Sequence, residues 1–274
     1  MKTFPALLAA LAVSATSACA VRSPASAPGL SDTLAADHRT PAFRERDRYR
    51  HPQETLAFFG LKPDQTVVEV WPGAGWYTEI LAPYLRAHGK YYAAGLVATP
   101  DASEYRRNSI GNFAKKLAER PDLYGRAIVT ELGSPDRWQA CPPGSADLVL
   151  TFRNVHNWMA GDYEAEMFKA FHDALKPGGV LGVVEHRARP GTSRDEMKKS
   201  GYVTEDHVIK VAEAAGFKLD ARSEINANRA DTTDHPEGVW TLPPTLRLGE
   251  KDREKYVGIG ESDRMTLRFV KSGG

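Results

Sequence analysis

The sequence has few cysteines, no excess of charge of either sign and no long hydrophobic run. Cys19 and Cys141 are the only cysteines in 274 residues, which excludes a disulfide framework and a cysteine-rich zinc module. The 36 basic and 35 acidic residues leave a formal net charge of +1, so no electrostatic footprint predicts a nucleic-acid partner. Hydrophobic residues at 42% and charged residues at 26% instead predict one soluble domain with a substantial core.

The first 20 residues have the pattern of a bacterial secretory signal. Lys2 precedes an apolar run over residues 4–13, and small residues follow as far as Ala20. The run is too short to span a bilayer, which takes roughly 20 residues. Two cleavages fit: one leaves Cys19 as the lipidated first residue of a lipoprotein, which the position of Cys19 favours, and the other is ordinary cleavage after Ala20. The sequence therefore predicts an exported protein, in the periplasm or anchored to a membrane only through lipid on Cys19.

Three further segments stand out by composition. Residues 21–40 are rich in Ala, Ser and Pro without an apolar period, which predicts a flexible tether ahead of a domain over residues 41–274. The mixed charges of residues 44–50 indicate either a solvated helix or loop face or a lid over a pocket. The long polar insertion 226–263 indicates either a cap, over residues 237–248, that borders a substrate pocket or a mobile surface insertion.

Residues 66–85 have the plan of a strand, a glycine turn and a helix. Residues 66–70 form a short run rich in β-branched side chains, and Gly73 and Gly75 follow in the turn. Residues 76–85 then carry apolar side chains at helical spacing. At the carboxyl edge of a parallel sheet such a turn lets a ligand approach bare backbone, and the first N–H groups of the helix suit a carboxylate or a phosphate. Thr78 stands where the dinucleotide fingerprint has its third glycine, so the turn alone does not specify the ligand.

Strands and helices alternate through the rest of the chain. This alternation is typical of an α/β protein with a doubly wound parallel sheet. The expected strands cover residues 89–94, 126–131, 145–152 and 180–185, with helices over residues 110–117 and 163–175.

These motifs resemble the class I S-adenosylmethionine-dependent methyltransferases. The acid and glycine turn of residues 67–75, the strand from Asp147, and above all Leu-Lys-Pro-Gly-Gly at residues 175–179 carry the resemblance, which spans about residues 52–271. Within the family, the Pro-Gly-x-Gly-Trp-Tyr-Thr turn of residues 72–78 is similar to that of a group of exported bacterial methyltransferases. The resemblance implies a three-layer αβα Rossmann-like sheet, with a last helix and an antiparallel last strand matched by residues 203–217 and 265–271.

The resemblance also implies that S-adenosylmethionine is bound at the glycine turn. Trp71 departs from the family, which usually has glycine there, and Gly95 and Leu96 stand where a carboxylate usually ends the second strand and holds the ribose hydroxyls. Asp101 and Glu104 follow closely and are candidates to replace that acid. The implied donor-binding residues are Glu69, Trp71, Pro72, Gly73, Gly75, Tyr77, Arg153 and Asn154, of which Tyr77 either covers the methionine end of the donor or packs in the core.

Methyl transfer requires a nucleophile aligned with the methyl group and a base where the nucleophile arrives protonated. In the family, such groups follow the fourth strand, and residues 153–158 here are rich in polar and aromatic side chains. His156 is the candidate base, or a loop histidine bonded only to backbone. Glu185, His186 and Arg187 end the fifth expected strand at the same edge, as a second base, an orienting carboxylate and an anion clamp. The predicted catalytic residues are therefore His156, Glu185 and His186.

Two functions remain after other chemistries are considered. A metal site built from His156, Glu185, His186, His207 or His235 lacks tight ligand spacing, so we predict no metal, and the absence of Gly-x-Ser-x-Gly excludes a serine hydrolase of that type. We expect an exported S-adenosylmethionine-dependent methyltransferase that acts on a small molecule or an envelope component. The alternative is a methyltransferase-shaped binding protein that has lost methyl transfer and holds another ligand in the same cleft. Neither nucleic acid nor a particular oligomeric state is predicted.

Overall fold

The computed structural model describes Met1 and residues 29–272, so the predicted secretory signal, its Cys19 and the start of the predicted tether lie outside the described residues. In the described part of the chain, no helix is long and apolar enough to cross a membrane. The prediction of a tether as far as residue 40 is wrong for its last part, because helix α1 (Leu30–Ala35) packs on α5 (Thr78–Leu85). Leu30 and Leu34, four residues apart, form the apolar stripe of α1 that joins the core.

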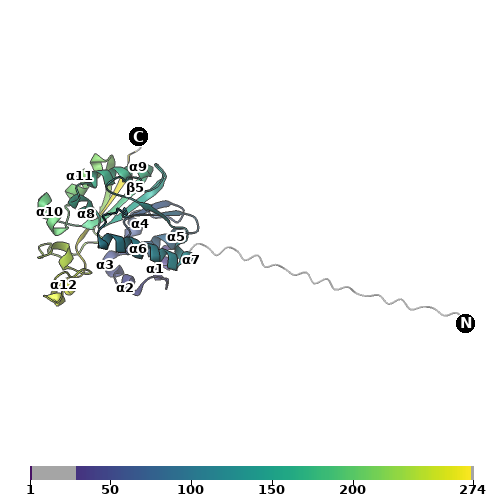
Figure 1. Ribbon diagram of the computed structural model, residues 1–274, viewed down its shortest axis with the longest axis horizontal. Helices are drawn as coiled ribbons and strands as arrows, with labels where there is room; N and C mark the ends of the chain where they lie inside the picture. Colours follow the sequence, from purple (N-terminus) through teal and green to yellow (C-terminus); the bar gives the residue numbers. More distant parts are fainter. Residues whose placement is uncertain (2–28, 273–274) are drawn as a thin grey trace.

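A single mixed sheet forms the centre of the described domain (Figure 1). Its strand order is β3-β2-β1-β4-β5-β7-β6, in which β1 to β5 run parallel and β7 runs antiparallel to β5 and β6. This confirms the predicted doubly wound sheet with an antiparallel last strand. The strands are β1 (Thr66–Val70), β2 (Lys90–Gly95), β3 (Ile128–Glu131), β4 (Ala146–Phe152), β5 (Leu175–His186), β6 (Phe217–Ser223) and β7 (Arg264–Lys271).

Two strands differ from the sequence prediction. The expected turn at residues 176–179 lies inside β5, where the register against β4 shifts between Ala146 and Leu148, so these residues bulge out of the ladder. Strand β6 was not predicted at all. It lies at the edge of the sheet and exposes charged residues in alternation, so its sequence has no continuous apolar run.

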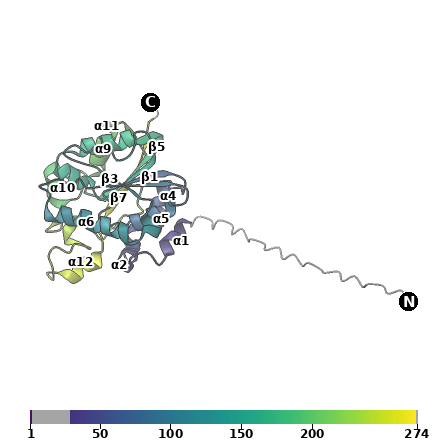
Figure 2. The same ribbon diagram turned by 45° about the vertical axis from the view of Figure 1, so that its right-hand side comes forward.

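Helices cover both faces of the sheet and give the predicted three layers (Figures 1 and 2). One apolar cluster joins one sheet face to α8 (Val155–Ala160), α9 (Glu164–Ala174), α10 (Arg194–Ser200) and α11 (Glu205–Ala214). The other cluster joins the opposite face to α1, α4 (Pro52–Phe58), α5, α6 (Glu104–Glu119) and α7 (Pro121–Tyr124), with Phe43 of α2 (Pro41–Arg44) packed against it. Short α3 (Asp47–Arg50) leads from α2 to α4.

The polar insertion lies between β6 and β7 and has little regular structure. It contains the 3-10 helix η1 (Gly238–Thr241) and α12 (Arg253–Ile259), which lies at the opposite end of the domain from the C-terminus in Figures 1 and 2. Val239 and Trp240 of η1 pack with Ala188 and Tyr202, which follow β5. The insertion is therefore held against the carboxyl end of β5.

Candidate active site

The glycine turn after β1 leaves its backbone uncovered at the carboxyl edge of the sheet. Trp71, Gly73 and Gly75 have φ angles of +49°, +58° and +82°, in the left-handed region that glycine adopts most readily. The Gly75 N–H donates to the Pro72 carbonyl at 2.9 Å. Gly73 and Ala74 are exposed, and a Cβ atom on Gly73 would meet nothing within 4 Å. The apex of the turn thus offers bare backbone to a ligand.

Trp71 keeps the backbone conformation of a glycine but adds an indole to the edge of the sheet. Its Nε1 donates to the Leu132 carbonyl at 2.8 Å, and its ring meets Trp158 of α8 edge-on at 5.7 Å. A Cβ atom on Gly133 would lie 3.3 Å from the indole, so only a glycine fits beside the ring there without a shift. The side chain therefore ties the end of β1 to the end of β3.

Glu69 holds the turn from beneath. Its carboxylate accepts hydrogen bonds from the Thr78 hydroxyl of α5 at 2.9 Å and from the Tyr91 hydroxyl of β2 at 2.5 Å. Burial raises the pKa of Glu69 to about 7, although both hydroxyl groups act to lower it. Glu69 therefore links β1, β2 and the start of α5, and its buried carboxyl group supports the turn rather than facing solvent.

Tyr77 packs in the core, the second of the two arrangements expected for it. Its ring stacks on Phe152 at 3.5 Å with an interplanar angle of 11° and meets Trp76 edge-on at 4.5 Å. Trp76 in turn donates from Nε1 to the Phe43 carbonyl at 2.9 Å and lies 4.7 Å beneath the Arg50 guanidinium. The residues after the glycine turn thus anchor the N-terminal helices.

No carboxylate occupies the end of β2, where the resemblance implies a ribose-binding acid. Glu131 is the nearest replacement, because it pairs in register with Gly95 and accepts a hydrogen bond from the Ala98 N–H at 2.9 Å. Asp101 is exposed, and a hydrogen bond from Thr99 lowers its pKa. Glu104 is exposed as well, in the first turn of α6.

His156 and Glu185 form a buried pair at the carboxyl ends of β4 and β5. His156 Nδ1 lies 3.1 Å from Glu185 Oε1, and the His156 N–H donates to Oε2 at 3.3 Å. The N–H of His186 donates to Oε1 at 2.7 Å, which fixes the carboxylate further. Because a carboxylate only accepts, the hydrogen of the imidazole lies on Nδ1 and leaves a lone pair on Nε2. This is the arrangement of an oriented general base.

Asn154 and Arg153 of the same loop have different surroundings. Asn154 Nδ2 donates to the Val70 carbonyl at 3.0 Å and to the Thr151 hydroxyl at 3.2 Å, so it ties the loop to β1. Arg153 has a φ angle of +61°, an uncommon conformation for a residue with a long side chain. Burial and the charge of Arg264 lower the pKa of Arg153 to about 10.

His186 completes a group of three candidate metal ligands with His156 and Glu185, whose ligand atoms lie within 4.8 Å of one another. The sequence prediction of no metal relied on spacing along the chain and did not foresee this convergence. His207 and His235 lie elsewhere, 3.6 Å from Glu164 and 2.9 Å from Asp231. Burial lowers the pKa of His186 well below its ordinary value, and His156 and nearby arginines lower it further, so His186 is neutral.

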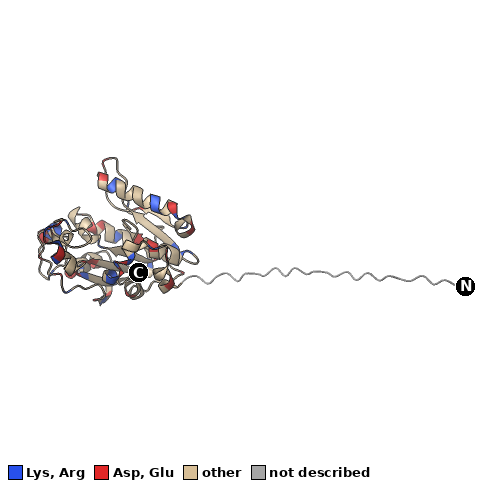
Figure 3. Ribbon diagram, turned by 90° about the horizontal axis from the view of Figure 1, so that it is seen from below, with Lys and Arg blue, Asp and Glu red and all other residues tan. Residues whose placement is uncertain are grey.

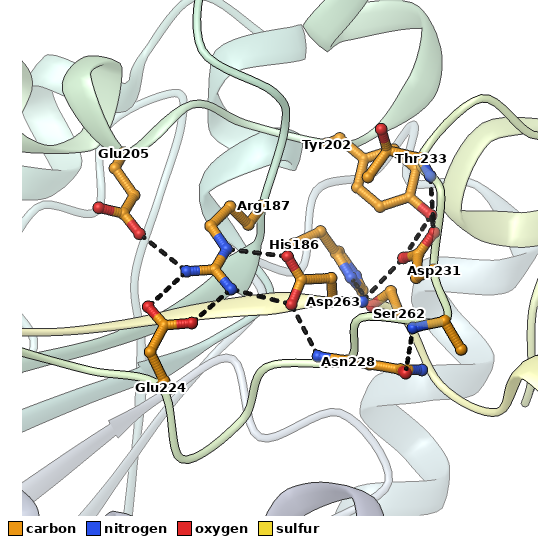
Figure 4. Close-up of polar contacts among 11 residues, drawn as sticks. His186, Arg187, Tyr202, Glu205, Glu224, Asn228, Asp231, Thr233, Ser262 and Asp263 are labelled. Carbon is orange, nitrogen blue, oxygen red and sulfur yellow. Dashed lines mark hydrogen bonds and ion pairs between the residues drawn. The ribbon is translucent and has the colours of Figure 1, made fainter.

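Arg187 is not the anion clamp that the sequence suggested. Its guanidinium binds Asp263, Glu224 and Glu205, with contacts of 2.8, 2.7 and 3.2 Å (Figure 4). Hydrogen bonds from Arg187 to Glu224 and Asp263 raise its pKa. Because three carboxylates already hold this guanidinium, Arg187 stabilises the insertion against β5 and has no free charge to offer an anion.

Trp240 of the insertion lies against the His156 side of the site. Its ring meets the imidazole edge-on with centroids 6.1 Å apart, and Arg247 stacks on it at 4.6 Å. Two open cavities of about 740 Å³ each lie elsewhere, one between α9 and α11 and one beside Arg187. The described structure therefore brings part of the predicted cap, residues 237–248, to the candidate base.

The charged run of residues 44–50 is partly buried, which contradicts the expectation of a solvated face. Arg50 is only 3% exposed, and Arg46 and Arg50 bind Glu261 at 2.6 and 3.3 Å. Arg264, at the start of β7, binds the same carboxylate. Sequence reasoning missed Glu261 and Arg264, because no local pattern links residues more than 200 positions apart.

Comparisons with known proteins agree on the fold. Neither a protein-family model nor a curated protein matches this sequence. A solved S-adenosylmethionine-dependent methyltransferase from Aquifex aeolicus has a TM-score of 0.54 at 17% identity, over 89% of this chain and 98% of that one. The cyclase SpnF has a TM-score of 0.56 at 17% identity, over 89% of this chain and 92% of that one. Haemonchus contortus phosphoethanolamine N-methyltransferase 2, in complex with S-adenosylmethionine, has a TM-score of 0.54 at 14% identity, over 91% of this chain and 61% of that one. The chain shares the Rossmann-like fold of these three proteins.

Proposed function

We propose that the protein is an exported methyltransferase that uses S-adenosylmethionine and acts on a small molecule or an envelope component. The observation that carries the proposal is the buried Glu185–His156 pair at the same carboxyl edge of the sheet as the open turn at Gly73. The Aquifex and Haemonchus structures support the donor, since both proteins are named as methyltransferases and the latter binds S-adenosylmethionine.

The residues at the turn fit a nucleoside donor in one respect and depart from the family in another. Gly73 leaves room for close approach to the backbone, and Glu69 fixes the turn from below through two hydroxyl groups. The acid expected at Gly95 is missing, and Glu131 on the neighbouring strand is the carboxylate next to that place. We assign the donor to the turn around Gly73, with Glu131 as the group that would hold its ribose.

When bound, S-adenosylmethionine supplies an already activated methyl group, so the protein needs chiefly to position the acceptor and accept a proton. His156 Nε2 takes the proton of an acceptor hydroxyl or amine, because Nδ1 is engaged with Glu185. Glu185 keeps the imidazole in this tautomer and stabilises its charged form. Trp240, beside the imidazole, helps to exclude water from the proton transfer.

The proposal includes export and lipid attachment, which rest on the leader alone. Residues 1–20 have the composition of a secretory signal, and Cys19 lies at the lipidation position. S-adenosylmethionine is made and held in the cytosol, so an exported enzyme needs a supply of donor outside it. Labelling of cells with radioactive palmitate tests the anchor: the wild-type protein is expected to incorporate label and Cys19→Ser is not.

The second candidate function is a binding protein that has lost methyl transfer. The specific observations that favour it are the Trp71 indole, which ties β1 to Leu132, and the absence of an acid at Gly95. Losing a charge-assisted pair costs about 1.5–3 kcal/mol per hydrogen bond, which weakens donor affinity by roughly one to two decades each. In this alternative the protein binds another ligand at the same edge and S-adenosylmethionine does not bind.

Calorimetric titration with S-adenosylhomocysteine, the product form of the donor, distinguishes the two functions. We expect binding by the wild-type protein and a loss of affinity of about 10-fold or more in Gly73→Ala, because the added methyl group enters the open face of the turn. Gly144→Ala is the matched control. Gly144 has a φ angle of +62°, against +58° for Gly73, has equally open space, and precedes β4 at the other edge of the sheet.

Equal affinity of the two glycine variants would contradict the placement of the donor at the turn. Absence of binding by the wild-type protein at millimolar S-adenosylhomocysteine and S-adenosylmethionine would overturn the methyltransferase proposal and favour the binding protein.

A further inference from the structure

Three arginines bind one buried carboxylate, and the charge of a fourth acts on it. Arg46, Arg50 and Arg264 each bind Glu261, with contacts of 2.6 and 3.3 Å for Arg46 and Arg50. Burial alone would raise the pKa of Glu261, but the charges of Arg264, Arg50, Arg153 and Arg46 outweigh it and hold this pKa well below its usual range. These five residues are the arginine cluster. Both signs of charge are interspersed over the rest of the fold (Figure 3), so this local excess of positive charge is distinctive.

Two groups of the arginine cluster, the Arg153 guanidinium and Nε of Arg264, lack a hydrogen-bond acceptor among the described residues. The Arg153 guanidinium makes no hydrogen bond or ion pair there, and the residue is half-buried. Nε of Arg264 is buried and lacks a partner, in a residue that is only 2% exposed. A half-buried guanidinium without an ion pair and a buried N–H without an acceptor both cost free energy, and an anion with acceptor oxygens would satisfy both groups.

The topology places these donors at the proposed active site. Arg153 directly follows β4, two residues before α8, and His156 belongs to the first turn of that helix. Arg264 begins β7 and is the cross-strand partner of His186, which follows Glu185. The backbone N–H of Arg153 donates to the Val184 carbonyl at 2.7 Å, directly before Glu185 on β5. The unsatisfied donors therefore lie beside the Glu185–His156 pair.

We infer that the methyl acceptor is an anion, whose carboxylate or phosphate group is held by Arg153 and Arg264 while its nucleophilic atom faces His156. The inference rests on the proposed function and names its substrate class. Arg50 and Arg46 contribute long-range attraction, and Glu261 keeps them in place. A neutral acceptor would leave the half-buried Arg153 guanidinium without a hydrogen-bond acceptor or an ion pair among the described residues.

The same arginine cluster argues against a divalent cation at His156, Glu185 and His186. Arg264 is the cross-strand partner of His186, and Arg153 is bonded to β5 directly before Glu185, so their positive charges would repel a metal ion. Glu185 is also engaged by three hydrogen bonds from His156 and His186. Metal binding is therefore an outcome that would contradict the inference.

The test is calorimetric titration of the full chain with inorganic phosphate and, in a separate arm, with succinate, in a buffer free of both. The two arms distinguish a phosphate-bearing from a carboxylate-bearing acceptor. We expect one of them to bind and Arg153→Gln to weaken it by about 10- to 100-fold, as for a charge-assisted contact. Arg153→Lys retains the charge and should lose less. Arg44→Gln is the control, since Arg44 is exposed on α2 and makes no ion pair with the described residues.

A parallel titration with S-adenosylhomocysteine distinguishes a failure of this inference from a failure of the proposed function. Unchanged affinity for it in Arg153→Gln supports an acceptor site, whereas an equal loss means that Arg153 holds the carboxylate of the donor and overturns the inference. Anion binding without any S-adenosylhomocysteine binding supports the anion site and overturns the methyltransferase. No binding of either anion at about 10 mM, or equal weakening by Arg44→Gln, overturns the site. So does stoichiometric binding of Zn²⁺ that His186→Ala removes.

Discussion

Replacement of Glu69 by glutamine should change how the stability of the protein depends on pH. Glu69 is buried under the glycine turn, and burial raises its pKa from 4.5 to about 7. In the unfolded chain its pKa returns to the ordinary value, so between these two pH values the folded state holds a proton that the unfolded state releases. The contribution of Glu69 to the free energy of unfolding is therefore fully present below pH 4.5 and is lost as the pH rises to about 7.

The size of the effect follows from the two pKa values. Between pH 5 and pH 8, the raised pKa costs the wild-type protein about 2–3 kcal/mol of unfolding free energy. Glu69→Gln has no proton to lose, and its amide oxygen still accepts from Thr78 and Tyr91. The unfolding free energy of the variant relative to wild type should accordingly rise by that amount across the same interval.

Urea unfolding followed by tryptophan fluorescence at the two pH values measures this difference. Other titratable groups, including His186, are the same in both proteins, so their contributions cancel when the two are compared. Glu104→Gln, at an exposed position of α6, is the control and should show no such change. If Glu69→Gln and wild type keep the same pH dependence, the carboxyl group is not desolvated beneath the turn, and the description of the turn's support is wrong.

Three further predictions concern the packing and chemistry of the site. Trp71→Phe removes the donor to the buried Leu132 carbonyl and should lower the unfolding free energy by about 1–3 kcal/mol in urea titrations. Glu261→Gln leaves the arginines without their carboxylate and should cost about 3–5 kcal/mol, whereas a loss below about 1 kcal/mol would contradict the cluster's arrangement. Glu185→Ala removes the acceptor of the Nδ1–H group and should abolish the preference of His156 for the Nδ1–H tautomer in ¹⁵N NMR spectra, and an unchanged tautomer would show that Glu185 does not orient the imidazole.

The order of most strands and helices could be predicted because the sequence patterns that indicate them are local. Apolar strands of the interior and the glycine turn after β1 follow from runs of neighbouring residues, whereas the antiparallel last strand at residues 265–271 was predicted only from the resemblance to methyltransferases. Strand β6 was missed because an edge strand needs only one covered face, and its exposed residues are charged. Helix α1 was missed because Leu30 and Leu34 are only two apolar residues in a segment otherwise typical of a tether.

Only those residues of the candidate site that lie at the ends of neighbouring strands could be predicted. His156, Glu185 and His186 were expected together because they follow neighbouring parallel strands, and the structure joins them. The arginine cluster was beyond reach, since Arg50 and Glu261 are 211 residues apart and pair only through the packing of the N-terminal helices on β7. Arg187 was mistaken for a free cation because its three carboxylate partners come from distant segments.

A crystal structure of the protein grown with S-adenosylhomocysteine tests the central claim most directly. The proposed function predicts that the nucleoside lies on the exposed backbone of Gly73, with its ribose at Glu131 and its sulfur toward His156. Electron density for the ligand anywhere else, or an unliganded turn with the Trp71 indole still bonded to Leu132 under saturating ligand, would contradict it.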